Sequence, residues 1–456
     1  MPSKHKSEKA DNASSNRKGS LKVGDTSGII NELTIQVDYS LDSLVEFNEI
    51  DFASAIRKNE LAVCMSNDDV AELAQGFDAS NARVSTLVIA ASDDSKIEDE
   101  DGSVLTELME AISELSSVTT LVFYGHDFEV LSFTAMPENV QELVFDKCKI
   151  GSIELDENDA ASVETLVFAN LTSGGTLTIP ENAFQNVKQL KIVRCHAENV
   201  EIQDGACPVG TILEMSSCRQ CETLTLGKDC FSQGEMLRVT RVPNLYRIEV
   251  GENAFENASE WNLSASLLKI LVLQGNNFCK MKEVDLQFPE LVEFRCGPNC
   301  MQEAKSLICQ DLGKLQKLII DEHCFERCKK LFFSDTDNLR ELVFGPYTFG
   351  SLTDEDLTLS DFPRLELLEF GKSSMAKLDR FILVKCSNLR TLRIGPKALK
   401  SCEYFVLLDY VNRVHMEEDV GKLQIIPEEY PNLPQEAEIQ CQANSFRVEG
   451  SDWARV

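Results

Sequence analysis

The stretch Leu342-Val343-Phe344-Gly345-Pro346-Tyr347-Thr348-Phe349 decides the fold, because its pattern returns along most of the chain. Two apolar residues on alternate positions are followed by a glycine, a short polar or aromatic segment and a phenylalanine. Ile248-Glu249-Val250-Gly251-Glu252-Asn253-Ala254-Phe255 repeats the same order. A pattern that recurs in this way predicts a repeat architecture rather than a single globular core.

The final residue of this pattern is an apolar anchor that returns at steps of 23 to 26 residues. The anchors are Phe184, Cys207, Phe231, Phe255, Phe278, Met301, Phe325, Phe349, Met375 and Leu399. A nearly fixed period with an apolar residue at each step indicates a solenoid.

Each coil carries two short segments of alternating apolar residues, which predict two short strands with one face inward. One segment precedes the corner, as in Leu318/Ile320 and Leu392/Ile394, and the other follows the anchor, as in Leu237/Val239. We therefore predict an α/β solenoid, mostly β, of about twelve coils with two parallel strand ladders. Glycine after the first strand, as at Gly251, permits a positive φ or a close backbone approach at the corner.

The spacing of the apolar residues resembles that of leucine-rich repeats. Copies are Leu315-x-x-Leu318-x-Ile320, Leu339-x-x-Leu342-x-Phe344 and Leu268-x-x-Leu271-x-Leu273-x-x-Asn276-x-Phe278. The Gly-x-x-Ala-Phe form and the period are similar to the BspA-like (treponemal-type) leucine-rich repeat family. The resemblance covers about Thr119 to Leu407. It implies a solenoid that binds other macromolecules on exposed strands and loops, and it brings no common catalytic residues.

The regions outside the regular repeat suggest four parts. Residues 1–28 are polar and locally basic and predict a disordered tail. Residues 29–118 predict an N-terminal cap with helix-bearing coils, 119–408 the leucine-rich repeat solenoid, and 409–456 a C-terminal cap. Within the N-terminal cap the expected elements are a strand with Leu33, Ile35 and Val37, strands at 60–65 and 84–89, and helices at 66–77 and 103–115, followed by a strand at 118–123.

The composition limits the kinds of partner and compartment. The formal net charge of −31 argues against nucleic acid, because binding to phosphates requires lysine and arginine. No long apolar run predicts a membrane span, and the polar N-terminus does not read as a signal peptide. We expect a cytoplasmic protein whose 16 cysteines are mostly free thiols.

The residues that could bind a metal or take part in catalysis are better explained by structural roles. Cys218-x-x-Cys221 has a spacing that suits zinc or redox chemistry, but both cysteines fall on positions that are apolar in other coils, such as Val242 and Leu245. The acidic segment 93–102 lacks carboxylates at two essential positions of a calcium loop, so we expect a solvated loop there. No catalytic, metal or cofactor site is expected.

Two functions remain in view. The first is a non-enzymatic scaffold that binds protein partners of unknown identity on the solenoid surface. The candidate contact residues are Tyr246, Arg247, Glu249, Arg340, Glu341, Arg390, Thr391 and Arg393. The alternative, suggested by the family resemblance, is a surface-exposed adhesion protein.

Overall fold

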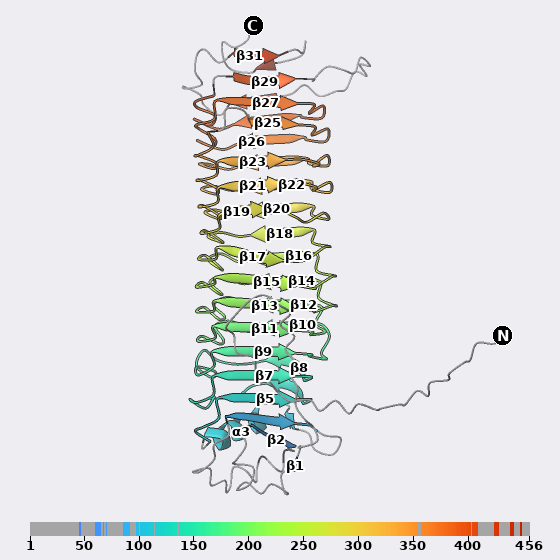
Figure 1. The fold of residues 1–456 in the computed structure, drawn as a ribbon, viewed down its shortest axis with the longest axis vertical. Coiled ribbons are helices and arrows are strands. Elements are labelled where there is room, and N and C mark those ends of the chain that lie inside the picture. Colours follow the sequence, from blue (N-terminus) through green and yellow to red (C-terminus); the bar gives the residue numbers. More distant parts are fainter. Residues whose placement is uncertain are drawn as a thin grey trace, which may run out of the picture.

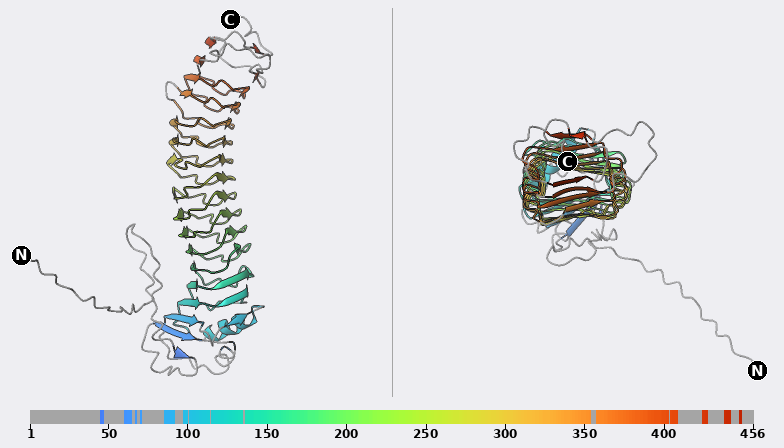
Figure 2. Two further views of the ribbon diagram at one scale, coloured as in Figure 1. Left: turned by 90° about the vertical axis from the view of Figure 1, so that its right-hand side faces the viewer. Right: turned by 90° about the horizontal axis from the view of Figure 1, so that it is seen from above.

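A computed structural model gives the architecture of the chain. It describes residues 85–91, 97–99, 101–113, 115–134, 136–353, 357–402 and 404–408, the short segments 45–46, 60–64, 424–427, 438–441 and 447–448, and residues 67 and 70. The described strands stack into one elongated solenoid (Figure 1). Seen along its long axis, the coils superimpose and the strands line two opposite faces (Figure 2). The predicted fold class is therefore confirmed.

The first face, which we call ladder A, contains one strand from each coil, hydrogen-bonded in a 10-stranded, a 3-stranded and a 4-stranded sheet. Its strands are β1 (Val45–Glu46), β2 (Glu60–Cys64), β3 (Thr86–Ala90), β5 (Thr120–Tyr124), β7 (Glu142–Asp146), β9 (Thr165–Ala169), β11 (Gln189–Val193), β13 (Ile212–Ser216), β15 (Met236–Thr240) and β17 (Glu260–Leu263), then β19 (Glu283–Asp285), β21 (Ser306–Cys309) and β23 (Lys330–Phe333), then β25 (Leu357–Ser360), β27 (Arg380–Val384), β29 (Tyr404–Leu408) and β31 (Glu438–Cys441).

The opposite face, ladder B, contains a 3-stranded sheet followed by a 12-stranded sheet. Its strands are β4 (Glu98–Asp99), β6 (Asp127–Leu131) and β8 (Lys149–Ile153), then β10 (Thr176–Ile179), β12 (Asn199–Ile202), β14 (Thr223–Leu226), β16 (Arg247–Val250), β18 (Ile270–Leu273), β20 (Glu293–Cys296), β22 (Lys317–Ile320), β24 (Glu341–Phe344), β26 (Leu367–Phe370), β28 (Thr391–Ile394), β30 (Gln424–Pro427) and β32 (Arg447–Val448).

The strands pair in parallel and in register, so that one coil repeats the side-chain positions of the coil before it. Leu213 of β13, for example, lies beside Leu190 of β11 and Leu237 of β15. Because side chains alternate along a strand, these residues all face the interior, and all three are fully buried. One continuous apolar cluster results, which runs from Val63 in β2 to Cys402.

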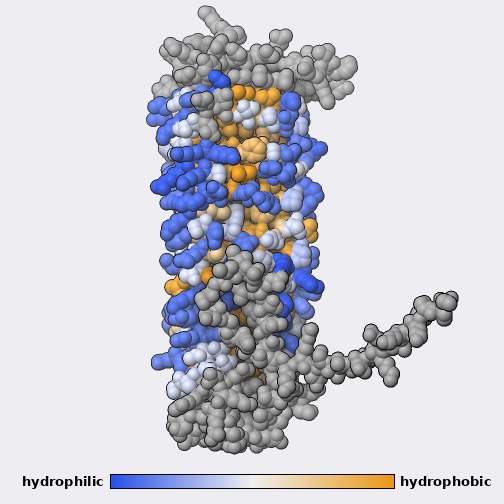
Figure 3. Space-filling model, viewed as in Figure 1, coloured by the Kyte–Doolittle hydropathy of each residue, from blue (hydrophilic) through white to orange (hydrophobic). Residues whose placement is uncertain are grey.

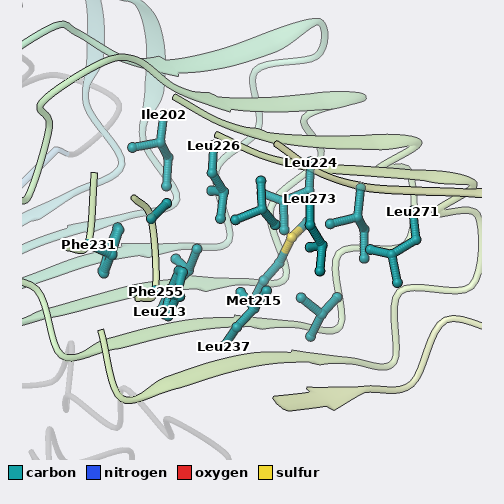
Figure 4. Close-up of a cluster of buried hydrophobic side chains, with 14 of the residues drawn as sticks. Ile202, Leu213, Met215, Leu224, Leu226, Phe231, Leu237, Phe255, Leu271 and Leu273 are labelled. Atoms are coloured by element: carbon teal, nitrogen blue, oxygen red, sulfur yellow. The ribbon is translucent and has the colours of Figure 1, made fainter. Parts of the chain in front are cut away.

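Aromatic anchors stack inside this cluster from coil to coil. The ring centroids of Phe231 and Phe255 are 5.3 Å apart, and those of Phe255 and Phe278 are 5.9 Å apart, with nearly parallel planes. Figure 4 shows Phe231 and Phe255 beside the buried leucines of the two ladders. Offset stacks of this kind add about 0.5–1.5 kcal/mol per pair to the burial of the rings.

The anchors have an unusual backbone conformation. Phe255 has a φ of 56° and Phe349 a φ of 54°, in the left-handed region that bulky residues rarely enter. The residue two positions earlier is also left-handed, as at Asn253 with a φ of 63°. The same pair of angles recurs at every anchor from Phe184 to Leu399. The corner is therefore strained, and its ladder hydrogen bonds and the burial of the anchor hold it in place.

The corner glycines have a different role. Gly251 does not have a positive φ, but a Cβ added there would lie 2.4 Å from the carbonyl carbon and oxygen of Gly227 in the preceding coil. At Gly345 the corresponding distance to the carbonyl carbon of Asp321 is 2.6 Å. Of the two reasons that the sequence suggests for these glycines, close backbone approach is the one that applies.

The helix α3 (Ser103–Ser113) lies between β4 and β5 in the chain and confirms the predicted helix over 103–115, although it ends two residues earlier. The expectation of a solvated acidic loop before it is wrong at Asp99, which is 2% exposed. Its carboxylate accepts hydrogen bonds from the backbone N–H of Gly102 at 2.9 Å and of Leu105 at 2.8 Å. The side chain therefore satisfies donors at the start of the helix, and this requires it to be buried.

The predicted N-terminal strands are confirmed at β2 and β3. The strand expected over 118–123 is β5, which begins two residues later and ends one residue later than predicted. Most of the helix predicted at 66–77, and the strand predicted around Leu33 and Val37, lie outside the described residues. Ladder strands occur on both sides of the proposed domain boundaries, since β1, β2 and β3 continue into β5 and β28 continues into β30. The boundaries themselves stay predictions.

The close approach at the corners leads to a test. We expect Gly251→Ala to destabilise the solenoid by about 1–3 kcal/mol, because the new methyl group overlaps the backbone of the preceding coil. Gly174→Ala is the matched control, since a Cβ there meets nothing within 4 Å. Urea unfolding followed by circular dichroism measures both, and equal midpoints for the two variants would contradict the steric explanation.

Candidate interaction surface

The candidate contact residues lie together on the outer face of ladder B. In β16, Ile248 and Val250 point inward and are buried, whereas Arg247 and Glu249 point outward and are half-buried. Glu341 in β24 and Thr391 and Arg393 in β28 take the same outward positions in their coils. The period-2 geometry of the strands thus places them on one surface.

Three of the candidates stand at the corner that leads into the strand. Tyr246, Arg340 and Arg390 each directly precede a ladder B strand. Arg340 and Arg390 are exposed, and Tyr246 is half-buried. The structure therefore brings all eight predicted residues onto one face that extends from β16 to β28.

Most charges on this face are paired between neighbouring coils. Arg340 Nη1 is 3.3 Å from Glu366 Oε1, Arg393 Nη1 is 3.0 Å from Glu369 Oε2, and Lys317 Nζ is 3.4 Å from Glu341 Oε2. Arg247 pairs with Glu249 of its own strand. Exposed pairs of this kind contribute about 0–1 kcal/mol each. The face therefore has mixed charge, and a partner that breaks these ion pairs loses little free energy.

Sequence reasoning missed the apolar part of the same face. Outward positions of neighbouring coils carry half-buried apolar side chains. They are Ile270, Val272, Ile319, Val343 and Leu367. Ile319 and Val343 are direct neighbours in the ladder. The signal was present in runs such as Lys317-Leu-Ile-Ile, where an apolar residue occupies an outward position.

An apolar strip bordered by paired charges is the arrangement that protein interfaces use: an apolar centre and a polar rim. On ladder B the centre runs along the middle strands, and Arg340, Glu366 and Arg393 stand toward its C-terminal side. The arrangement can bind an extended or flat partner.

The cysteines have the structural role that repeat alignment predicts. Cys218 and Cys221 are 1% and 0% exposed and belong to the interior cluster. Cys148 and Cys195 occupy the position of Cys218 in earlier coils, and each thiol lies 3.4 Å from the carbonyl oxygen of a residue in the preceding coil, Phe123 and Phe168 respectively. Among the residues that the structure describes, no group of three or more His, Cys, Asp or Glu side chains could hold a metal ion.

The described histidines do not converge. His126 is buried, with Nδ1 accepting from the N–H of Ile97 at 3.2 Å and Nε2 3.1 Å from the carbonyl oxygen of Ile89. His323 stacks on Tyr347 with ring centroids 4.8 Å apart, on the corner between coils. Local structure therefore explains His126 and His323, and the third described histidine, His196, is exposed on a different coil.

Comparison with known proteins identifies the repeat. The family model described as "BspA type Leucine rich repeat region" matches six copies, over residues 106–207 and 171–272. Residues 106–272 therefore resemble BspA-type leucine-rich repeats. The described repeats continue well beyond residue 272, since the 12-stranded sheet of ladder B extends to β32.

Comparisons with solved structures and with curated proteins give no further information on function. One solved structure, "Crystal structure of TLR13-ssRNA13 complex", shares 12% sequence identity over 76% of this chain and 74% of that chain, with a TM-score of 0.18. A likeness at that level carries no argument about this chain. No curated protein matches the chain. In the part of the chain that the structure describes, no helix is long and apolar enough to cross a membrane.

The burial of the thiols leads to a prediction on reactivity. Burial raises the pKa of Cys148, Cys221 and Cys386 from 9.0 to about 12. At pH 8 this lowers the thiolate fraction by roughly a thousandfold, and only the thiolate reacts with alkylating reagents. We expect these cysteines to resist iodoacetamide in the native protein and to react fully in guanidinium chloride.

Peptide mass spectrometry after timed labelling measures each site. Cys279 is the internal comparison: burial raises its pKa to about 12 as well, but its thiol is half-buried rather than buried, so it should react faster than Cys148, Cys221 and Cys386. Equal native and denatured rates at Cys221 would contradict its assignment to the core.

Proposed function

We propose that this protein is a non-enzymatic scaffold that binds protein partners through the outer face of ladder B. The observation that carries the proposal is the apolar strip from Ile270 to Leu367, bordered by charges that are paired on the surface. The strip lies on the longest unbroken sheet among the described strands, which gives a partner a rigid and extended surface. Rigid surfaces lose little conformational entropy on binding.

The partner class follows from the charge. A net charge of −31 repels the phosphates of nucleic acid, so we propose protein partners that present apolar groups together with basic ones. We also propose a cytoplasmic location, which the many unpaired thiols of the described region support, because reducing compartments preserve free cysteine.

Charge reversal on the surface tests the proposed face. We expect Arg340→Glu/Arg390→Glu/Arg393→Glu to lose the partners captured by the parent protein, because the substitutions remove the guanidinium donors at the rim of the apolar strip and so break hydrogen bonds across the interface. Folding should be unaffected, since the ion pairs involved are exposed. Affinity capture from source cells with quantitative mass spectrometry measures the loss.

The control reverses as many charges on the other face. Lys305→Glu/Lys329→Glu/Lys330→Glu gives the same net charge on exposed residues of ladder A. Partners should stay bound to this variant. Equal loss from both variants would indicate a general charge effect, and retention by both would exclude ladder B as the binding face.

A surface-exposed adhesion protein is the second candidate, favoured by the match to BspA-type repeats. Here we expect protease treatment of intact cells to remove the protein, whereas a cytoplasmic scaffold would survive until the cells are lysed. A cytoplasmic enzyme and a known surface protein serve as controls for lysis and for shaving. Survival on intact cells would exclude the adhesion role.

A further inference from the structure

Ladder A is interrupted between β17 and β19, and we call this interruption the first break. The 10-stranded sheet ends at β17, and the next sheet of ladder A begins at β19. On ladder B the same coils stay paired, since β18 is in register with both β16 and β20. The coils therefore remain stacked at the first break, and only the pairing of the two ladder A strands is lost.

The first break exposes side chains that face the interior of the solenoid. In the ladder, Trp261 lies beside Leu237, which points inward and is fully buried. Leu263 lies in the same way beside the buried Val239. Trp261 and Leu263 therefore point inward too, yet both are only half-buried. An apolar surface of the interior is thus open to a partner at this point.

The second interruption of ladder A, between β23 and β25, shows the same effect. Phe333 takes an inward position in β23 and is only half-buried. It packs edge-on against Phe362 of the next coil, as Trp261 packs against Phe278 at the first break. Loss of strand pairing, rather than the size of one side chain, therefore opens the interior. Figure 3 looks onto ladder A and shows apolar side chains along the middle of its upper part, between hydrophilic borders.

The outward positions around the first break are acidic. Glu260 in β17, and Glu283 and Asp285 in β19, are exposed. Lys282 directly precedes Glu283 but pairs with Glu303. Among the residues that the structure describes, no lysine or arginine forms an ion pair with any of the three carboxylates. Their charge is therefore uncompensated and attracts cationic groups.

We propose that the first break is a docking site for an extended segment of a partner protein in which lysine or arginine residues flank leucine or aromatic side chains. The apolar side chains pack against Trp261 and Leu263. The cationic groups meet Glu260, Glu283 and Asp285. Tryptophan is enriched among the residues that dominate binding energy, and complementary charge selects the segment that binds.

This site is separate from the surface proposed on ladder B. It lies on the opposite face of the solenoid and depends on one opening in a ladder rather than on a surface of many coils. A segment that binds at the first break leaves the outer face of ladder B accessible. The inference is therefore independent of the function proposed for ladder B.

Trp261 gives a direct signal for a test, because the chain has only one other tryptophan, Trp453. In the full-length Trp453→Phe protein, tryptophan fluorescence comes from Trp261 alone. The probe is a short peptide in which lysine alternates with leucine and phenylalanine. We expect its binding to shift the emission to shorter wavelength, because the peptide displaces water from the half-buried ring. The same peptide with serine in place of leucine and phenylalanine should bind at least about tenfold more weakly.

Neutralisation of the rim tests the role of charge. Glu260→Gln/Glu283→Gln/Asp285→Asn should weaken the binding of the lysine–leucine–phenylalanine peptide by at least about tenfold, because it removes the complementary charges. The three side chains are exposed, so the fold should be retained, and circular dichroism checks this.

The matched control removes as many charges elsewhere. Glu154→Gln/Glu198→Gln/Glu222→Gln changes exposed residues away from the first break and should leave the affinity unchanged. Equal weakening in both variants would reduce the binding to a general attraction to an acidic chain and overturn the proposal. The proposal also fails if the serine peptide binds as tightly, or if the peptide binds without a shift in the emission of Trp261.

If the rim variant does not fold, a photo-crosslink to the parent chain replaces it. The probe then carries p-benzoylphenylalanine in place of phenylalanine. Crosslinks to residues 260–263 or 283–285 support the proposal. Crosslinks only to other residues, those of ladder B included, refute it.

Discussion

The rest of the structure depends on parallel backbone pairing between one coil and the next. A coil of about 24 residues cannot bury an apolar core by itself, so it is stable only when its two strands are paired with those of its neighbours. Pairing in register is possible only if every coil returns after nearly the same number of residues. The steps of 23 to 26 residues between the anchors meet this requirement, and Leu190, Leu213 and Leu237 lie in one line as a result.

This regular stacking requires a strained backbone at the corners. Each coil has to turn sharply after its ladder B strand, and it does so with two left-handed residues, as at Asn253 and Phe255. Asparagine adopts that conformation readily, but phenylalanine does not. The anchor is therefore held by what surrounds it: the stacked rings of Phe231 and Phe278, and the hydrogen bond from its N–H to the carbonyl oxygen of Phe231 at 3.0 Å. Because the N–H groups of Phe231, Phe255 and Phe278 each bond to the carbonyl oxygen of the anchor in the preceding coil, a strained corner is stable only while the neighbouring corner is also ordered.

Sequence periodicity predicts the fold well because burial is periodic. The assignment of Cys218 and Cys221 to the core follows from the period alone, and both are buried. Features that depend on a single side chain are harder to predict from the sequence. The sequence pattern around Asp99 does not predict that this residue caps a helix. The positions of Arg340 and Arg393 in the sequence do not predict their ion pairs with Glu366 and Glu369, because these residues become neighbours only when the coils stack. The candidate face was therefore located by its strands, while its apolar centre at Ile319 and Val343 was overlooked.

The two ladders differ in a way that bears on how the surface is used. From β10 onward ladder B is one unbroken sheet, whereas ladder A is interrupted after β17 and after β23. The first interruption falls where β17 holds Trp261 and Leu263 only half-buried, and Trp261 packs edge-on against Phe278 with centroids 5.2 Å apart. A partner that spans several coils requires a constant spacing between its contacts, and of the two described faces ladder B is the one that provides it.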